Sequence, residues 1–296
     1  MIPKISILIP AYEDGKRLER LLRSIEEQTE KDYQVIISDD SESDDCKKVA
    51  RKFSNRMALT YLPHKRGKTA AANWNNLLRY APGKIIKFMH QDDWFAEPES
   101  LKKMVDLLEE SGCSFAFSGW KLVNASNYVY GFISPEQERN LRENIDNLFL
   151  GNCIGAPSDT IFYKNEVLFD EEMRWAVDID FYLQYLHCRP GFALTREPLV
   201  CIEQHDGQVT KQVQNDDAIN LREFEKIFQK YSLDNVTMFC EYMLKIRMRR
   251  QKYITMKDLQ GCRTNKVISL WFRERINYYK SSMKKRILKI FHGKIG

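Results

Sequence analysis

Residues 85–95, Ile-Ile-Lys-Phe-Met-His-Gln-Asp-Asp-Trp-Phe, join an apolar strand to two adjacent carboxylates, Asp92 and Asp93. A charge at the end of a buried strand is costly unless something binds it. Magnesium takes one or two carboxylates together with substrate phosphates, so a divalent cation beside a phosphorylated ligand would suit this position. A solvated turn, in which the Asp side chains bond their own backbone, is the alternative interpretation.

Strands and helices alternate over the first 120 residues around this stretch. The predicted strands cover residues 4–9, 35–37, 59–62, 85–89 and 114–117. Apolar side chains at helical spacing predict helices over residues 18–25, 46–53, 69–80 and 98–112, the last ended by Gly112. This alternation predicts an α/β fold with an open, mostly parallel sheet and helices on both faces.

Polar residues follow each of the first four strands, at residues 10–14, 39–40, 64–68 and 90–93. Open parallel sheets bind ligands beyond the carboxyl ends of their strands, so a binding site is expected there. The basic loop at 64–68 leads into a helix start, which suits a diphosphate, although each of its cations taken singly is more typical of a solvated surface charge. The sequence has neither the Gly-x-Gly-x-x-Gly nor the Walker pattern, which disfavours a dehydrogenase and a phosphate-loop ATPase.

Two later residues are candidates for chemistry. Asp178 stands at the start of a predicted helix, where a carboxylate serves either as a cap or as a general base that takes a proton from a hydroxyl. Asp180 is the alternative for the second role. His205 lies in a polar, Gly-containing loop, where a metal-binding role is feasible.

Taken in order, four segments resemble glycosyltransferase family 2, the inverting enzymes with the GT-A fold. They are residues 6–13, residues 35–41, the segment 71–75 with 88–94, and Val177-Asp178 together with His205. The resemblance covers residues 3–212. It implies a nucleotide-sugar-dependent transferase with a divalent metal, Mn²⁺ or Mg²⁺, and a role in polysaccharide biosynthesis.

The resemblance also implies roles for individual residues. Asp178 falls on the position of the catalytic base, and Asp93 and His205 fall on metal-contacting positions. The residues expected to hold the nucleotide sugar are Pro10, Tyr12, Glu13, Asp39, Asp40, Lys68, Asn73, Gln91 and Asp92. The family often has Glu before the base and Arg shortly after it, where this chain has Val177 and Gln184. No clear Gln-x-x-Arg-Trp is present, which disfavours a processive synthase.

The function expected from these observations is transfer of a sugar from a nucleoside diphosphate sugar to a hydroxyl of a glycan or lipid-linked glycan. The expected donor is a UDP-sugar. A sugar-1-phosphate nucleotidyltransferase is the first alternative, but such an enzyme would need a Gly-rich basic signature after the first strand. A catalytically silent sugar-nucleotide-binding protein is the second. No nucleic-acid partner is expected.

Charge divides the chain into two regions, predicted as a catalytic domain over residues 1–214 and a basic helical region over residues 215–296. Residues 245–296 carry a net charge of +14 while the whole chain carries +5, so residues 1–244 carry −9. An apolar stripe between basic residues predicts that residues 270–291 form an amphipathic helix on an anionic membrane surface. The alternative is that this helix packs on the acidic catalytic domain. The stripe consists of Phe272, Ile276, Tyr279, Met283, Ile287 and Ile290.

The location expected from sequence is cytoplasmic, peripheral to the membrane at most. The first ten residues lack a secretory cleavage site, and the chain has no apolar run of about 18 residues. Seven cysteines are scattered without a Cys-x-x-Cys pair, a pattern typical of reduced thiols.

Overall fold

The computed structural model describes residues 2–63, 69–124, 127–205, 208, 216–231, 233 and 276. The predicted nucleotide ligand Lys68 lies outside the described residues. So does the predicted membrane helix at 270–291, apart from Ile276.

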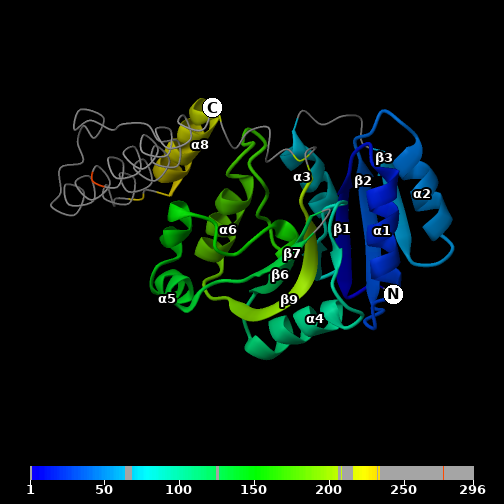
Figure 1. Cartoon of the computed structure of the whole chain (residues 1–296), viewed down its shortest axis with the longest axis horizontal. Helices are drawn as coiled ribbons and strands as arrows, with labels where there is room; N and C mark the ends of the chain where they lie inside the picture. Colours follow the sequence, from blue (N-terminus) through cyan, green and yellow to red (C-terminus); the bar gives the residue numbers. More distant parts are fainter. Residues whose placement is uncertain are drawn as a thin grey trace, which may run out of the picture. The chain divides into compact units, whose positions relative to one another are not determined.

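The first half of the sheet is parallel. Strand β1 (Ile5–Ala11) lies between β2 (Tyr33–Asp39) and β4 (Ile85–Phe88), and β3 (Leu59–Pro63) lies beyond β2. The register pairs Ala11 with Asp39, so the loops after β1 and β2 leave the sheet side by side. The predicted α/β class is confirmed, and the first four predicted strands each match an observed strand (Figure 1).

The second half of the sheet mixes directions, which the strand patterns did not indicate. Strand β8 (Thr160–Tyr163) is antiparallel to both β4 and β6 (Phe115–Val123), and β9 (Ala193–Glu203) runs parallel to β6. Two short strands, β5 (Trp94–Phe95) and β7 (Tyr128–Gly131), pair with β9 and β6 in antiparallel fashion. The overall order is β3-β2-β1-β4-β8-β6-β9-β5.

One face of the sheet is covered by α1 (Gly15–Glu26), α2 (Asp45–Phe53) and α4 (Ser100–Ser111). Their apolar stripes share one core with the side chains of Ile5, Ile7 and Ile9 on β1. In α1 this stripe is Leu18, Leu21, Leu22 and Ile25, the set that the helical spacing predicted. Gly112 ends α4 with a φ of 68°, a left-handed conformation that glycine adopts at little cost.

Aromatic side chains fill a second core, which joins β4 to α6 (Val177–Cys188). Phe88 of β4 contacts Phe169 with ring centroids 5.5 Å apart, and Phe169 stacks on Phe181 of α6 at 4.1 Å. Phe162 of β8 lies against the same helix, 5.4 Å from Phe181 and 5.2 Å from Tyr185. The helix that carries Asp178 is therefore packed against the strand that leads to Asp92 and Asp93.

Five further helices lie in the described part of the chain. They are α3 (Ala70–Tyr80), α5 (Pro135–Glu143), the short 3₁₀ helices η1 (Ile145–Leu150) and η2 (Pro157–Asp159), and α8 (Asp217–Lys230). Thr69 caps α3 by accepting the Ala72 N–H at 3.3 Å. None of the helices in the described part is both long enough and apolar enough to cross a bilayer.

The chain forms two compact units, Met1–Glu223 and Phe224–Gly296. The first unit continues past residue 214 into the first half of α8. The division into a catalytic domain and a basic helical region at residues 214 and 215 stays a prediction.

Gly119 is required where β6 and β9 approach each other most closely. The pairing of these strands is irregular on both sides of Gly119, and a Cβ there would lie 2.6 Å from the Arg196 carbonyl oxygen. We expect Gly119→Ala to lower the free energy of unfolding by about 1–3 kcal/mol, because backbone atoms must move to admit the methyl group. Urea denaturation measures this change.

Gly112→Asn is the matched control for that measurement. Nothing lies within 4 Å of the Cβ position at Gly112, and asparagine tolerates a left-handed backbone. Gly112→Asn should lower the free energy of unfolding by less than Gly119→Ala does. An equal cost at both positions would contradict the role assigned to the close approach.

Candidate active site

Asp93 is buried at the turn between β4 and β5. Its backbone N–H donates to the His90 carbonyl at 3.0 Å, and its side chain is only 2% exposed. Burial raises the pKa of Asp93 well above its usual range, and the neighbouring carboxylate of Asp92 raises it further. The Ser158 hydroxyl and the Glu203 backbone N–H oppose this rise by hydrogen bonding. A bound cation would compensate the cost of burying this carboxylate.

His90, Asp92 and Asp93 together form a candidate metal group, because one ligand atom from each lies within 4.8 Å of the other two. The His90 Nε2 atom is buried and has no hydrogen-bond partner in the described part of the chain. Burial lowers the pKa of His90, which favours the neutral imidazole that binds metals. Trp74 stacks on this ring at a centroid distance of 5.0 Å. The donor set therefore fits a divalent cation.

His205 lies next to this group and contacts Asp92. Its Nε2 atom is 3.1 Å from Asp92 Oδ2, and the Gln208 amide donates to the same oxygen at 3.3 Å. The structure thus brings His205 to the predicted site from the loop after β9. The imidazole within the candidate metal group, however, belongs to His90, a residue that the sequence patterns did not single out.

A buried lysine in β4 stabilises the turn that carries the metal group. Lys87 of β4 is fully buried, and its ammonium group donates to the carbonyls of Ser158 and, at 3.3 Å, Thr160. The Ser158 hydroxyl in turn accepts the His90 backbone N–H at 2.9 Å. Burial lowers the pKa of Lys87 to about 7, against the opposing effect of the Asp159 and Asp93 carboxylates. Helix η2 is thereby tied to the turn that carries the metal group.

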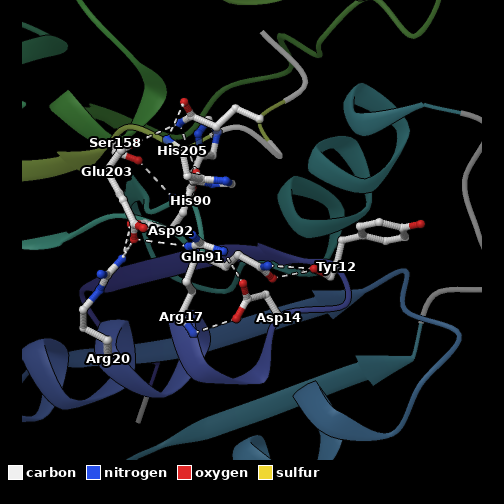
Figure 2. Close-up of polar contacts among 11 residues, drawn as sticks. Tyr12, Asp14, Arg17, Arg20, His90, Gln91, Asp92, Ser158, Glu203 and His205 are labelled. Carbon is white, nitrogen blue, oxygen red and sulfur yellow. Dashed lines mark hydrogen bonds and ion pairs between the residues drawn. The ribbon is translucent and has the colours of Figure 1, made fainter. Parts of the chain in front are cut away.

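Glu203, at the end of β9, connects the turn to α1 (Figure 2). It forms ion pairs with Arg17, at 2.9 Å, and with Arg20. Burial raises the pKa of Glu203, but the hydrogen bonds from the two guanidinium groups outweigh this effect and hold it at about 2. Arg20 also donates to the Asp92 carbonyl at 2.6 Å and lies over the Trp94 ring at 3.9 Å. The backbone of Asp92 is therefore held from the α1 side.

Gln91 and Tyr12 hold each other by a reciprocal pair of hydrogen bonds, drawn in Figure 2. The Tyr12 N–H donates to Gln91 Oε1 at 2.6 Å, and Gln91 Nε2 donates to the Tyr12 carbonyl at 2.7 Å. Both ends of the Gln91 amide thus bind backbone. The ring of Tyr12 is 51% exposed, so it is free to stack on a flat ligand.

The two aspartates predicted after β2 differ in their surroundings. Asp39 is buried, and its carboxylate accepts hydrogen bonds from the Ser41 N–H at 2.9 Å and the Tyr61 hydroxyl at 2.6 Å. Asp40 is partly exposed, and its backbone N–H donates to the Ala11 carbonyl at 3.0 Å. Asp39 therefore shapes the loop, whereas the Asp40 side chain is the more accessible of the two.

Three more predicted ligands lie around the same loops. Pro10 stands in β1 opposite Ser38. Glu13 has a φ of 53°, and its carboxylate accepts the backbone N–H groups of residues 42 and 43 at 2.5 and 3.3 Å. Asn73 is buried and donates to the Ser38 carbonyl at 3.1 Å, while its Oδ1 atom has no partner in the described part of the chain. Glu13 thus supports the loop, and Asn73 keeps an acceptor available.

Asp178 lies in the first turn of α6 and is partly exposed. Asn152 donates to its Oδ2 atom at 2.7 Å, and the Ile179 N–H donates to Oδ1 at 2.9 Å. Burial raises the pKa of Asp178 to about 6, although both hydrogen bonds favour the ionised form. A carboxylate that titrates near 6 is ionised at neutral pH and can accept a proton. Asp180 is fully buried, so Asp178 is the more accessible of the two candidates.

Glu223 of α8 holds the turn that leads into α6. Its carboxylate accepts the backbone N–H groups of Arg174, Trp175 and Ala176 at 2.7, 2.8 and 2.9 Å. Three donors satisfied by one carboxylate fix the start of the helix that carries Asp178. No sequence motif indicated this role for Glu223.

The arrangement combines three capabilities. The metal group could hold a cation and, through it, the charge of a diphosphate. The exposed ring of Tyr12 could stack on a base, and Asp178 could accept a proton.

Comparison with known proteins matches this chain to one family model. The model described as "Glycosyl transferase family 2" matches residues 6–169. A UDP-Glc:alpha-D-GlcNAc-diphosphoundecaprenol beta-1,3-glucosyltransferase, WfgD of Escherichia coli, is 26% identical over 180 residues, which is 60% of this chain and 67% of that protein.

Two solved structures share the fold. The chain superposes on S. aureus TarS 1-349 in complex with UDP-GlcNAc with a TM-score of 0.60 and 16% identity, covering 94% of this chain and 92% of that one. It superposes on the mannosyltransferase PcManGT of Pyrobaculum calidifontis, in complex with GDP-Man and Mn²⁺, with a TM-score of 0.55 and 15% identity. That match covers 94% of this chain and 84% of the other.

Asp93→Asn tests the metal group. We expect Mn²⁺ to raise the Tm of the wild-type chain and the variant to lose most of that increase. Without Mn²⁺, the Tm of the variant at neutral pH should be at least as high as that of the wild type. Because the pKa of Asp93 is raised from 3.8, the folded chain keeps a proton that the unfolded chain releases, so rising pH destabilises the wild type.

Thermal unfolding with and without Mn²⁺ measures both effects, with Asp40→Asn as the control that removes a carboxylate outside the metal group. A wild-type Mn²⁺ response in Asp93→Asn would contradict the assignment.

Proposed function

The chain belongs to glycosyl transferase family 2 and has the GT-A fold, and from this we propose that it transfers a sugar from a UDP-sugar to a hydroxyl group of a lipid-linked glycan. Glycosyl transfer is the activity for which the family and WfgD are named, so the nucleotidyltransferase and the silent binding protein are not favoured. The donor, the acceptor and the residue roles given below are our proposals.

The observation that carries the proposal is the cluster of His90, Asp92 and Asp93 at the end of β4. A divalent cation held there would neutralise the charge that builds on the departing diphosphate. PcManGT was solved with Mn²⁺, which supports the choice of this metal. Asp93 and His90 would be the direct ligands, with Asp92 beside the ribose or sugar and His205 adjacent.

The loops after β1 and β2 would bind the nucleotide. Tyr12 would stack on the base, held in place by Gln91. Asp40 would bind the polar edge of the base, and the free Oδ1 atom of Asn73 would accept from the donor. A uridine nucleotide is supported by WfgD, named for UDP-Glc, and by TarS, solved with UDP-GlcNAc.

Asp178 would act as the general base. It would take the proton from the acceptor hydroxyl as that oxygen attacks the anomeric carbon opposite the leaving diphosphate. One displacement inverts the anomeric configuration and needs no covalent intermediate. Asn152 would position the carboxylate, and Glu223 would hold the start of its helix.

A lipid-linked acceptor is supported by WfgD, whose name specifies a diphosphoundecaprenol substrate. Such an acceptor is met at a bilayer surface. The net charge of +14 over residues 245–296 would favour peripheral attachment to an anionic leaflet on the cytoplasmic side.

The function is tested with a panel of nucleoside diphosphates and their sugars in the presence of Mn²⁺. We expect a UDP-sugar to raise the Tm most and to release UDP slowly without an acceptor. Failure of every nucleotide sugar in the panel to stabilise the chain would overturn the proposal.

Asp178→Asn separates binding from chemistry. Asparagine keeps the size of the carboxylate and can accept one of its two hydrogen bonds, but it cannot take a proton at neutral pH. We expect turnover to fall by roughly 10²- to 10⁴-fold while UDP-sugar affinity is nearly unchanged. Asp180→Asn should do much less. The reverse order of the two variants in a transfer assay would move the base to Asp180.

The pH profile should report the titration of Asp178. The base works only when ionised, so kcat/KM should fall as the pH drops below about 6 and should be flat above it. Asn152→Ala removes a hydrogen bond that lowers this pKa, so the acidic limb should move to higher pH.

Asn147→Ala serves as the control for the pH profile, because Asn147 donates to the Asn140 carbonyl instead. An acidic limb that stays in place in Asn152→Ala would argue against Asp178 as the titrating base.

A further inference from the structure

The hairpin of β6 and β7 carries a cluster of exposed aromatic side chains that the proposed chemistry does not use. Tyr128 and Tyr130 are 55% and 53% exposed. They are two residues apart on one strand, so both side chains lie on the same face. Contiguous exposed apolar surface often marks a binding site.

The two tyrosines and Lys121 form one surface, which we call the tyrosine platform. The rings of Tyr128 and Tyr130 are 5.4 Å apart at an angle of 67°. Lys121 pairs across the hairpin with Tyr130, and its ammonium group lies 4.0 Å from the centre of the Tyr128 ring. The platform therefore combines two angled aromatic rings, two phenolic hydroxyls and one cation.

The sheet register connects the platform to the candidate active site. Val123 of β6 pairs with Tyr128 on one side and with Glu203 on the other. The Gln204 N–H donates to the Val123 carbonyl at 2.7 Å, one residue before His205. Strand β6 alone therefore separates Tyr128 from Glu203, the residue that ties the metal-group turn to α1.

We propose that the tyrosine platform binds a sugar ring of the acceptor, an inference that rests on the proposed glycosyl transfer. A pyranose has an apolar C–H face and a rim of hydroxyls. Tyrosine matches this with an apolar ring and a polar tip, and Lys121 adds a donor for a hydroxyl or an anionic group. The platform would select acceptors with a sugar beside the reacting hydroxyl.

A lipid surface is the other partner that exposed tyrosines suit. Two features favour the saccharide. The platform contains a single cation, whereas attachment to anionic lipid needs several. Its position one strand from Glu203 suits a substrate of the transfer reaction.

The test uses saturation-transfer NMR on the full chain with methyl glycosides of glucose, galactose, mannose and N-acetylglucosamine at millimolar concentration. Saturating the aromatic protons should transfer magnetisation to the C–H protons of at least one sugar. Tyr128→Ala/Tyr130→Ala should bind that sugar about tenfold more weakly, whereas Tyr128→Phe/Tyr130→Phe should retain most of the binding. Val129→Ala is the matched control, since Val129 is 63% exposed on the opposite face of the same strand.

Donor binding is measured in the same variants, and it should be unchanged because the platform lies outside the donor site. If the wild-type chain binds no nucleotide sugar, the proposed function is overturned. The saturation-transfer signal would still show whether the tyrosine platform binds a saccharide. If the double alanine variant fails to fold, Tyr128→Ala alone is used.

Three results would overturn the inference. They are the absence of transfer to any sugar in the wild type, an undiminished signal in the alanine variants, and tyrosine-dependent flotation with anionic vesicles without sugar binding.

Discussion

The cost of burying negative charge at the end of β4 shapes the surroundings of the site. Asp93 and Asp159 are both buried, and burial raises the pKa of each, that of Asp159 to about 8. Lys87 lies fully buried next to them, and Ser158 binds the turn that carries Asp93. Desolvated charges of this kind are tolerated only where partners or ligands compensate them. The same desolvation favours the binding of a cation at this turn.

Aromatic packing links the two chemical halves of the site. The chain of rings from Phe88 through Phe169 to Phe181 runs from the metal strand to the helix of the base. Interdigitated aromatic rings resist displacement because the interior is close-packed. Transfer needs the acceptor oxygen and the donor carbon held within a narrow range of distance. A rigid aromatic core between the two elements would meet that need without a residue that touches both substrates.

Local patterns predicted much of this structure. The apolar stripe of α1, the glycine that ends α4 and the strand before Asp92 follow from periodicity and backbone preference. Residues that act through long-range contact left no such pattern. His90 joins the metal group only because a turn folds it back, and Asn152 reaches Asp178 from a separate loop. Lys87 is buried because carbonyl groups of a later segment accept its hydrogen bonds. Antiparallel insertion of β8 likewise depends on pairing that one strand cannot specify.

The three hydrogen bonds accepted by Glu223 set a lower limit on the length of a working catalytic fragment. A chain shortened before this glutamate would lose the anchor of the turn that leads into α6. The smallest fragment that keeps Asp178 in place therefore extends at least to residue 223, inside α8.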